Sequence, residues 1–271
     1  MMEHPLDFYH FTYIYNIYII YFYTPPINMK AIILAAGIAS RLRPLTNDRP
    51  KCLLEIGNKC LLQRTFDALI ANGINQFVVV TGYLHTLIED FLTRSYPTLN
   101  ITFIHNERYA STNNIYSLWL AQPAAEGEDI LLLDSDILFD PAIVTRLLQS
   151  PYPDTLALNN HPLGEEEMKI IPDTQGRVKE ISKTCSIEQA AGESIGIERM
   201  SSTYTRALYA ELRQMIQQEG LDNIFYERAF ERLIPQGHTF HILDTTDLFS
   251  TELDTVEDFN SAKQLIPSAL Y

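Results

Sequence analysis

The sequence is poor in cysteine and in positive charge. Its 271 residues include three cysteines, Cys52, Cys60 and Cys185, whose spacing fits neither a zinc site nor a disulfide framework. Because such a small, scattered set needs no oxidising compartment, we expect a cytoplasmic protein. Lysine and arginine number 20 against 34 acidic residues, which gives a formal net charge of −14. A chain this acidic is not expected to bind nucleic acid or an anionic membrane surface.

The chain also lacks an internal repeat and a linker that would divide it. We therefore expect residues 29–271 to form one domain. Residues 1–28 stand apart, because they are crowded with Tyr, Phe and Ile and contain no Lys or Arg. A signal peptide or membrane anchor normally has a basic flank. We interpret residues 1–28 as a non-native or disordered extension before a start at Met29, with a membrane anchor as the alternative.

The strongest motif runs from Met29 to Lys51. It begins with a short apolar run at 31–35 that has no helical period, which predicts a buried strand. The small residues 36–40 then leave backbone N–H groups open to phosphate oxygens. Arg41, Arg43 and Lys51 can neutralise the charge of a bound polyphosphate.

Farther along, strand-like and helix-like patterns alternate. A helical period that ends at Gly73 is followed by a β-branched strand, the arrangement of a parallel strand–helix–strand unit. Ligands of such sheets bind beyond the carboxyl ends of the strands. We predict a Rossmann-like α/β fold with three α/β/α layers and a mixed, mostly parallel sheet. The expected elements include a helix at 61–72, strands at 77–80, 101–105 and 130–133, and an antiparallel pair at 164–171 and 176–183.

Two aspartates follow the predicted strand at 130–133. Asp134 and Asp136 share a face if that strand continues, because alternate strand residues point the same way. Carboxylates at this position can hold Mg²⁺, which prefers oxygen ligands. The alternative is a helix cap before Pro141, a role that Asp140 also suits.

The stretch L-A-A-G-I-A-S-R-L-R-P-L-T, with the later P-K, resembles the signature of the nucleotidyltransferase superfamily. This superfamily includes sugar-1-phosphate nucleotidyltransferases and phosphocholine cytidylyltransferases. Ala39 stands where the family pattern has a second glycine, which suggests that this position does not need a positive φ. The N-N-I-Y-S-L element at 113–118 is similar to the phosphocholine cytidylyltransferase branch.

The resemblance implies a Mg²⁺-dependent enzyme that uses CTP, or another NTP, and a small phosphorylated acceptor. The family's metal aspartates align with Asp136 and Asp254. Arg41, Lys51 and Lys183 are the catalytic candidates, and Lys183 matches a lysine that binds the acceptor phosphate. The nucleotide-binding residues implied are Leu34, Ala35, Ala36, Gly37, Ala39, Ser40, Arg41, Lys51, Thr81, Gly82, Asn113, Asn114 and Asp134. A plain turn at Thr81 and a helix cap at Asn113 stay open as alternatives.

The acceptor pocket has weaker sequence support. The segment 191–197 resembles a family strand that forms the floor of this pocket. Glu193 lies in this segment. Tyr226 and Glu227 match an aromatic–acidic pair that suits a quaternary ammonium group, although core packing of the aromatic ring stays open. Lys169, on the preceding strand, is expected to be solvated.

We therefore predict transfer of CMP from CTP to a phosphocholine-like alcohol or a phosphonate, with release of pyrophosphate. One alternative is a sugar-1-phosphate or inositol-1-phosphate nucleotidyltransferase. Another is a non-catalytic, nucleotide-binding regulatory relative, which the intact Arg41, Lys51, Asp136 and Asp254 disfavour. The sequence identifies neither the acceptor nor the oligomeric state, so a homo-oligomer stays open.

Overall fold

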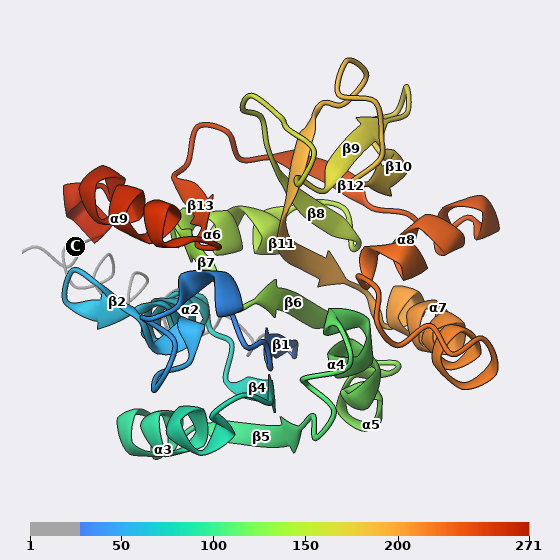
Figure 1. The fold of residues 1–271 in the computed structure, drawn as a ribbon. Coiled ribbons are helices and arrows are strands. Elements are labelled where there is room, and N and C mark those ends of the chain that lie inside the picture. The colour runs from blue at the N-terminus through green and yellow to red at the C-terminus, as the bar shows by residue number, and fades with distance from the viewer. Residues whose placement is uncertain (1–27, 271) are drawn as a thin grey trace, which may run out of the picture.

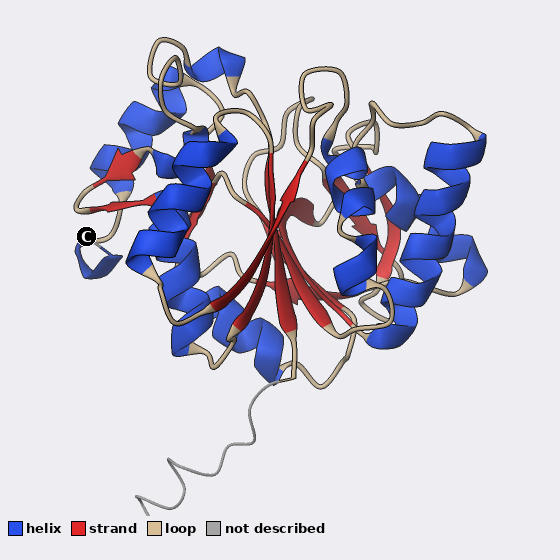
Figure 2. Cartoon of the chain, turned by 90° about the horizontal axis from the view of Figure 1, so that it is seen from below, coloured by secondary structure: helices blue, strands red, loops and turns tan. Residues whose placement is uncertain are grey.

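The computed structural model describes residues 28–270, so the interpretation of the N-terminal segment lies outside the described residues. A central twisted sheet is covered by helices on both faces (Figures 1 and 2). This arrangement confirms the predicted three-layer α/β/α fold. Within residues 28–270, no helix is long and apolar enough to cross a membrane.

The central sheet has nine strands. Their pairings show that seven strands run in one direction, whereas β10 (Val178–Ser182) and β11 (Gly192–Met200) run in the other. The predicted mixed, mostly parallel sheet is thus confirmed. The strands are β1 (Lys30–Ala35), β4 (Gln76–Thr81), β5 (Asn100–His105), β6 (Ile130–Asp134), β8 (Thr155–Asn159), β9 (Lys169–Pro172), β10 (Val178–Ser182), β11 (Gly192–Met200) and β12 (His241–Asp244).

The parallel strands are apolar on both faces because each face is covered by a helical layer. Ile32 of β1 faces one apolar cluster and Ile33 faces the other. One layer contains α2 (Leu61–Ala71), α3 (His85–Ser95) and α6 (Ala142–Gln149). The opposite layer contains α4 (Asn114–Leu120), α5 (Gln122–Ala125), α7 (Ser202–Arg213) and α8 (Glu227–Leu233).

A smaller substructure carries the C-terminal helix α9 (Val256–Leu265) and packs around its own apolar cluster. Thr255 and Asp258 form a reciprocal capping box that fixes the start of α9. The substructure includes two short antiparallel pairs, β2 (Glu55–Ile56) with β3 (Lys59–Cys60) and β7 (Ile137–Phe139) with β13 (Ser250–Glu252). Because β7 follows β6 and β13 precedes α9, their pairing brings residues about a hundred positions apart in the sequence to one place.

β11 joins the two halves of the sheet. Its last four residues pair with β6, whereas Gly192 and Glu193 pair with β9. Gly196 bends the strand between these halves with φ +68°, where the pairing with β8 shifts register. A Cβ atom at Gly196 would lie 2.8 Å from an Asp134 carboxylate oxygen, so glycine is required for both conformation and space.

Two expected elements differ from the structure. The strand predicted at 164–171 begins only at Lys169, because residues 164–168 form a loop. The strand that carries Asp134 ends at that residue, and Asp136 lies in the following turn. The condition for a shared face of Asp134 and Asp136 is therefore not met.

Candidate active site

A cleft of about 1030 Å³ lies at the carboxyl ends of β1 and β6. Its "β1 end" is formed by the loop after β1 and by the start of α4. Its "β11 end" is formed by His161, residues 166–168, Lys183, residues 193–196, Phe225 and Glu227. The carboxylates of Asp136 and Asp254 also line the cleft. The fold therefore places the sequence-predicted motifs where ligands of α/β sheets bind.

All but three of the predicted site residues line this cleft, and the exceptions are Thr81, Gly82 and Tyr226. Thr81 is fully buried, and its hydroxyl donates to Glu89 at 3.2 Å. Gly82 packs against the loop after β1. A Cβ atom at this position would lie 2.6 Å from the Ala36 carbonyl oxygen. Direct nucleotide contact by Thr81 and Gly82 thus has no support from their positions, but Gly82 permits the close packing behind the loop.

The loop after β1 corrects one expectation. Ala39 adopts a left-handed conformation with φ +50° and ψ +51°, so this position does have a positive φ. The Ala39 carbonyl accepts hydrogen bonds from the Thr46 hydroxyl at 2.9 Å and the Leu42 N–H at 3.1 Å. These bonds offset the cost of the left-handed conformation for a residue with a side chain. Arg43, unlike Arg41, does not line the cleft.

Lys51 lies between two aspartates at the middle of the cleft. Its Nζ is 2.9 Å from Asp136 Oδ2 and 2.8 Å from Asp254 Oδ1. Arg41 forms a second ion pair with Asp254. Burial lowers the pKa of Lys51, but the charges of Asp136 and Asp254 outweigh burial and raise it. Lys51 is therefore a permanently charged group that neutralises these carboxylates.

Glu252 joins Asp136 and Asp254 in a carboxylate triad whose nearest oxygens lie within 4.8 Å of one another. Sequence reasoning missed Glu252, although it lies two residues before Asp254, the spacing of side chains on one face of an extended strand. Asp136 Oδ1 is buried and has no hydrogen-bond partner among residues 28–270. Clustered oxygen donors and an unpartnered carboxylate oxygen fit a hard divalent cation.

The pKa values of the triad reflect its crowding. Burial, and then the charges of Asp136 and Asp254, raise the pKa of Glu252 to about 8. Burial also acts to raise the pKa of Asp254, but Lys51 and Arg41 hold it below its usual range. The three carboxylates are matched by two cations, Lys51 and Arg41, and a divalent cation would supply further positive charge.

Asp134 is one of the residues that line the cleft. Its Oδ2 accepts a hydrogen bond from the Tyr226 hydroxyl at 3.0 Å. Burial raises the pKa of Asp134 well above its usual value, and the neighbouring Asp136 raises it further. Tyr226 itself is 0% exposed. Direct contact of the Tyr226 ring with a ligand therefore has no support, and its observed role is to hold Asp134.

Asn113 and Asn114 line the β1 end and connect α4 to α8. The Asn113 side chain caps α4 by accepting from the Asn114 N–H at 2.8 Å. The Asn114 side-chain oxygen instead accepts from the Tyr226 N–H at 3.0 Å. Asn113 therefore has the capping role considered from the sequence, while the cleft-lining position of both residues leaves room for ligand contact.

His161 and Glu193 form a pair at the β11 end. His161 Nε2 is 2.6 Å from Glu193 Oε1, and Nδ1 is 3.0 Å from the Pro162 carbonyl. The Pro162 carbonyl and an ionised Glu193 both accept hydrogen bonds, and this arrangement favours a protonated imidazole, whereas burial raises the pKa of Glu193. Burial lowers the pKa of His161, but the Glu193 carboxylate raises it overall. No motif in the sequence marked His161, because its partner lies 32 residues away.

Lys183 and Phe225 lie together at the same end. The Lys183 ammonium is 4.5 Å from the centre of the Phe225 ring and 3.3 Å from Glu166 Oε2. Phe225 is 41% exposed, unlike its buried neighbour Tyr226. The sequence predicted that Tyr226 would present its ring to the acceptor. In the structure the neighbouring residue Phe225 lines the cleft instead.

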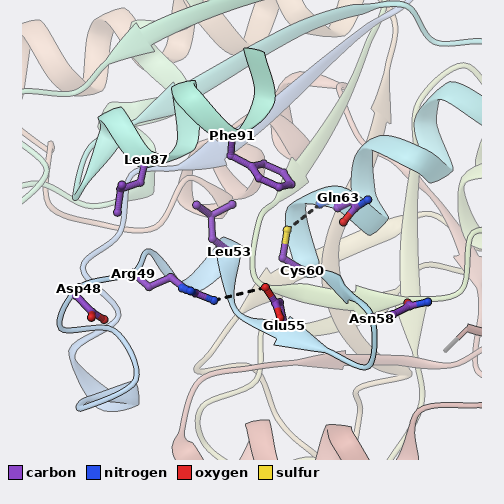
Figure 3. Close-up of a pocket in the computed structure, with 9 residues that line it drawn as sticks. All are labelled: Asp48, Arg49, Leu53, Glu55, Asn58, Cys60, Gln63, Leu87 and Phe91. Carbon is purple, nitrogen blue, oxygen red and sulfur yellow. Dashed lines mark hydrogen bonds and ion pairs between the residues drawn. The ribbon is translucent and has the colours of Figure 1, made fainter. Parts of the chain in front are cut away.

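A second hollow of about 340 Å³ lies outside the cleft and contains none of the predicted site residues (Figure 3). Cys60 Sγ accepts from the Gln63 N–H at 3.4 Å and so caps α2. Arg49 and Glu55 form an ion pair of 3.6 Å at the rim. All three cysteines are free thiols, in agreement with the expected absence of disulfides. The contacts around this hollow, a helix cap and an ion pair, are structural and do not indicate a ligand site.

Comparison with known proteins places this geometry in context. The family model described as "MobA-like NTP transferase domain" matches residues 31–233. A CTP:phosphoglutamine cytidylyltransferase of Campylobacter jejuni is 27% identical over 252 residues, covering 87% of this chain and 91% of that protein. A CMP-5'-(3-aminopropyl)phosphonate synthase of Streptomyces rubellomurinus is 27% identical over 251 residues, covering 89% of this chain but 39% of that protein.

The solved structure of CTP:phosphocholine cytidylyltransferase from Streptococcus pneumoniae superimposes with a TM-score of 0.73. The match covers 89% of this chain and 100% of that one, at 22% sequence identity. At this low sequence identity, the match shows that the two proteins share a fold and no more.

Proposed function

Since the chain belongs to the family of MobA-like NTP transferase domains, we propose that it transfers CMP from CTP to a small phosphorylated alcohol or a phosphonate and releases pyrophosphate. The motif resemblance to nucleotidyltransferases is confirmed by this family match. The choice of CTP and of a small acceptor is supported by what the two relatives of similar sequence are named for.

The observation that carries the proposal is the difference between the two ends of one cleft. The β1 end has a loop of mostly small residues, whose backbone N–H groups would suit phosphate oxygens, and Arg41 and Lys51 of the same cleft can supply positive charge to a triphosphate. The β11 end carries Lys183 and His161 together with several carboxylates. The carboxylate triad lies between the ends, where the reacting phosphates would meet.

The charge at the β11 end favours an acceptor that itself carries a positive group. The acidic residues there are Glu166, Glu167, Glu193 and Glu227, and the basic ones are His161 and Lys183. Burial raises the pKa of Glu227 to about 7, so this residue is only partly ionised at neutral pH, but the acidic groups still outnumber the basic ones. A phosphate dianion entering alone would be repelled, whereas a zwitterionic phosphate or phosphonate brings a compensating cation.

The proposed reaction needs no protein nucleophile. A phosphate or phosphonate oxygen of the acceptor attacks the α-phosphorus of CTP, and the bond from this phosphorus to the α–β bridging oxygen breaks. The electron pair leaves with pyrophosphate. The residues of the chain position both substrates and neutralise charge: Arg41 and Lys51 at the triphosphate, and Lys183 at the acceptor phosphate.

Asp136, Glu252 and Asp254 would hold a divalent cation, for which we propose Mg²⁺. When bound, the cation neutralises charge on the phosphate oxygens of the nucleotide. Lys51, which contacts two of these carboxylates, would then be free to bind phosphate.

The test is pyrophosphate release by the full chain with Mg²⁺. CTP, UTP, dTTP, ATP and GTP are crossed with phosphocholine, 2-aminoethylphosphonate, inositol 1-phosphate and glucose 1-phosphate, and Asp136→Asn serves as the inactive control. We expect release with CTP and a small cationic acceptor. Release only with a sugar or inositol phosphate would overturn the proposal, and binding of nucleotide without release in any pair would favour a regulatory relative.

A further inference from the structure

Glu227 is a cleft-lining carboxylate with an unused hydrogen-bonding atom. It is the first residue of α8, its side chain lines the β11 end, and it is 7% exposed. Its Oε2 is buried and has no hydrogen-bond partner among residues 28–270. Because a buried acceptor without a donor costs free energy, this atom marks a place for a hydrogen-bond donor of the ligand.

We propose that the acceptor is held at Glu227 by a protonated amine, so that the substrate is an aminoalkyl phosphonate or phosphate and not a quaternary ammonium compound. This inference rests on the proposed function and narrows its acceptor. A primary ammonium group carries three N–H donors, whereas a trimethylammonium group has none. Only the former can satisfy Oε2 of Glu227.

The other carboxylates of the β11 end already have partners. Glu193 accepts from His161, Glu166 pairs with Lys183, and Glu167 accepts from the Gly164 N–H at 2.8 Å. Burial raises the pKa of Glu227 to about 7, although a hydrogen bond from its own backbone N–H and the charge of Lys183 act to lower it, so the ionised form lacks a cation partner strong enough to offset burial. A cationic N–H group beside Glu227 would provide one.

The aromatic side chains also argue against a cage for a quaternary ammonium group. The phenyl and phenol rings that line the cleft, within the described residues, belong to Tyr109 and Phe225. Tyr109 packs beside Gly82 at the β1 end, and the Phe225 face already carries the Lys183 ammonium. Quaternary ammonium groups are typically held by a cage of aromatic faces, and this end of the cleft does not offer one.

The experiment compares matched acceptors with the full chain, saturating CTP and Mg²⁺. The pairs are 2-aminoethylphosphonate against its N,N,N-trimethyl analogue, and phosphoethanolamine against phosphocholine. We expect kcat/KM to be at least about tenfold higher for the amine of each pair, because a site built for an N–H donor rejects an analogue without one. Equal rates, or a preference for the trimethyl compounds, would overturn the inference while leaving the proposed function intact.

Glu227→Gln provides the second test. We expect kcat/KM for the amines to fall at least about tenfold and the amine-to-trimethyl ratio to approach one, with the KM for CTP unchanged. Glu231→Gln, on the exposed side of the same helix, is the matched control and should change neither. A Glu227→Gln enzyme that keeps the wild-type ratio would overturn the inference. No turnover of any acceptor by the wild type would instead contradict the proposed function and, with it, this inference.

Discussion

The buried ammonium of Lys169 donates a 2.7 Å hydrogen bond to the backbone carbonyl of Lys183, the residue assigned to the acceptor phosphate. Lys169 is 1% exposed, so the expectation of a solvated side chain was wrong. Its Nζ also donates to the carbonyls of Glu165 and Glu167, each at 3.2 Å. One side chain therefore fixes the loop before β9 against the end of β10.

We expect Lys169→Met to loosen the β11 end of the cleft. The variant keeps most of the side-chain volume but leaves three carbonyls without a charged donor, at a cost of about 2 kcal/mol in the free energy of unfolding. Urea denaturation measures this loss. Because the carbonyls lie at one end of the cleft, the KM for the acceptor should rise severalfold while the KM for CTP stays constant.

The matched control for this prediction is Lys179→Met, which removes an exposed lysine paired with Glu180 on β10. It should lower stability by less than about 0.5 kcal/mol, as expected for a surface ion pair. If both lysine variants altered the two KM values alike, Lys169 would have no special positioning role.

Asp136→Asn should abolish most turnover while nucleotide binding persists. The substitution removes a negative charge from the carboxylate triad but keeps its size, and we expect kcat to fall about 100-fold or more. Nucleotide affinity is measured by isothermal titration calorimetry, and turnover by pyrophosphate release. Chelation of divalent ions should reproduce the loss in the wild type, and added Mg²⁺ should restore activity. Full activity in the presence of chelator would contradict the assigned metal site.

Lys51→Met should separate metal affinity from turnover. The Lys51 ammonium lies within 2.9 Å of both Asp136 and Asp254, so it competes with a cation for the same carboxylates. Without it, we expect Mg²⁺ to bind at least about fivefold more tightly, while kcat falls because the triphosphate loses a counter-charge. Calorimetric titration of wild type and variant with Mg²⁺ decides the matter. Lys59→Met, whose lysine pairs with Asp67 outside the cleft, is the control. Weaker Mg²⁺ binding by Lys51→Met would show that the lysine supports the site.

Stability should depend on the protonation of Glu227. Burial raises its pKa from 4.5 to about 7 in the folded protein, so the folded state binds the proton more tightly than the unfolded state. The resulting stabilisation is complete below the unfolded pKa and is lost as pH rises through about 7. Glu227→Gln cannot ionise, so relative to wild type it should gain about 2 to 3 kcal/mol between about pH 5 and 8.

Urea denaturation of both proteins across this pH range provides the measurement. Glu198 and Asp134 lie near Glu227, whose charge raises the pKa of both, so the difference between the two proteins reports the titration of this coupled group. Glu231→Gln should show no pH-dependent gain. A constant difference between Glu227→Gln and wild type at all pH values would mean that Glu227 ionises normally in the folded state.

Much of the fold was predictable because the buried parallel strands are continuous apolar runs. The helix at 61–72 and the strand at 77–80 were found within a residue of their observed ends, and Gly73 follows α2 as expected. The strand at 164–171 was predicted too long, because only residues 168–170 alternate apolar and polar, whereas the run G-E-E-E at 164–167 belongs to the loop before Lys169.

The site was predictable where a motif was compact and less so where it depended on tertiary contacts. The loop after β1 and the two metal aspartates were located correctly within the cleft, although their roles stay predictions. His161 was missed because it lies in a loop and its partner Glu193 lies 32 residues away on β11. The conformation of Ala39 was misjudged because two hydrogen bonds to its carbonyl, invisible in the sequence, stabilise the left-handed backbone.

The continuity of β11 has a consequence for how such an enzyme can diversify. This single strand pairs with β6, beside the loop that we propose for the nucleotide, and with β9, beside the end of the cleft that we propose for the acceptor. Under the proposed function, the length of β11 therefore sets the distance between the two substrates. Residues 160–168 form a surface loop beside the Gly192 end of this strand. We expect that exchange of that loop changes the preferred acceptor while the nucleotide-binding end of the cleft is unaltered.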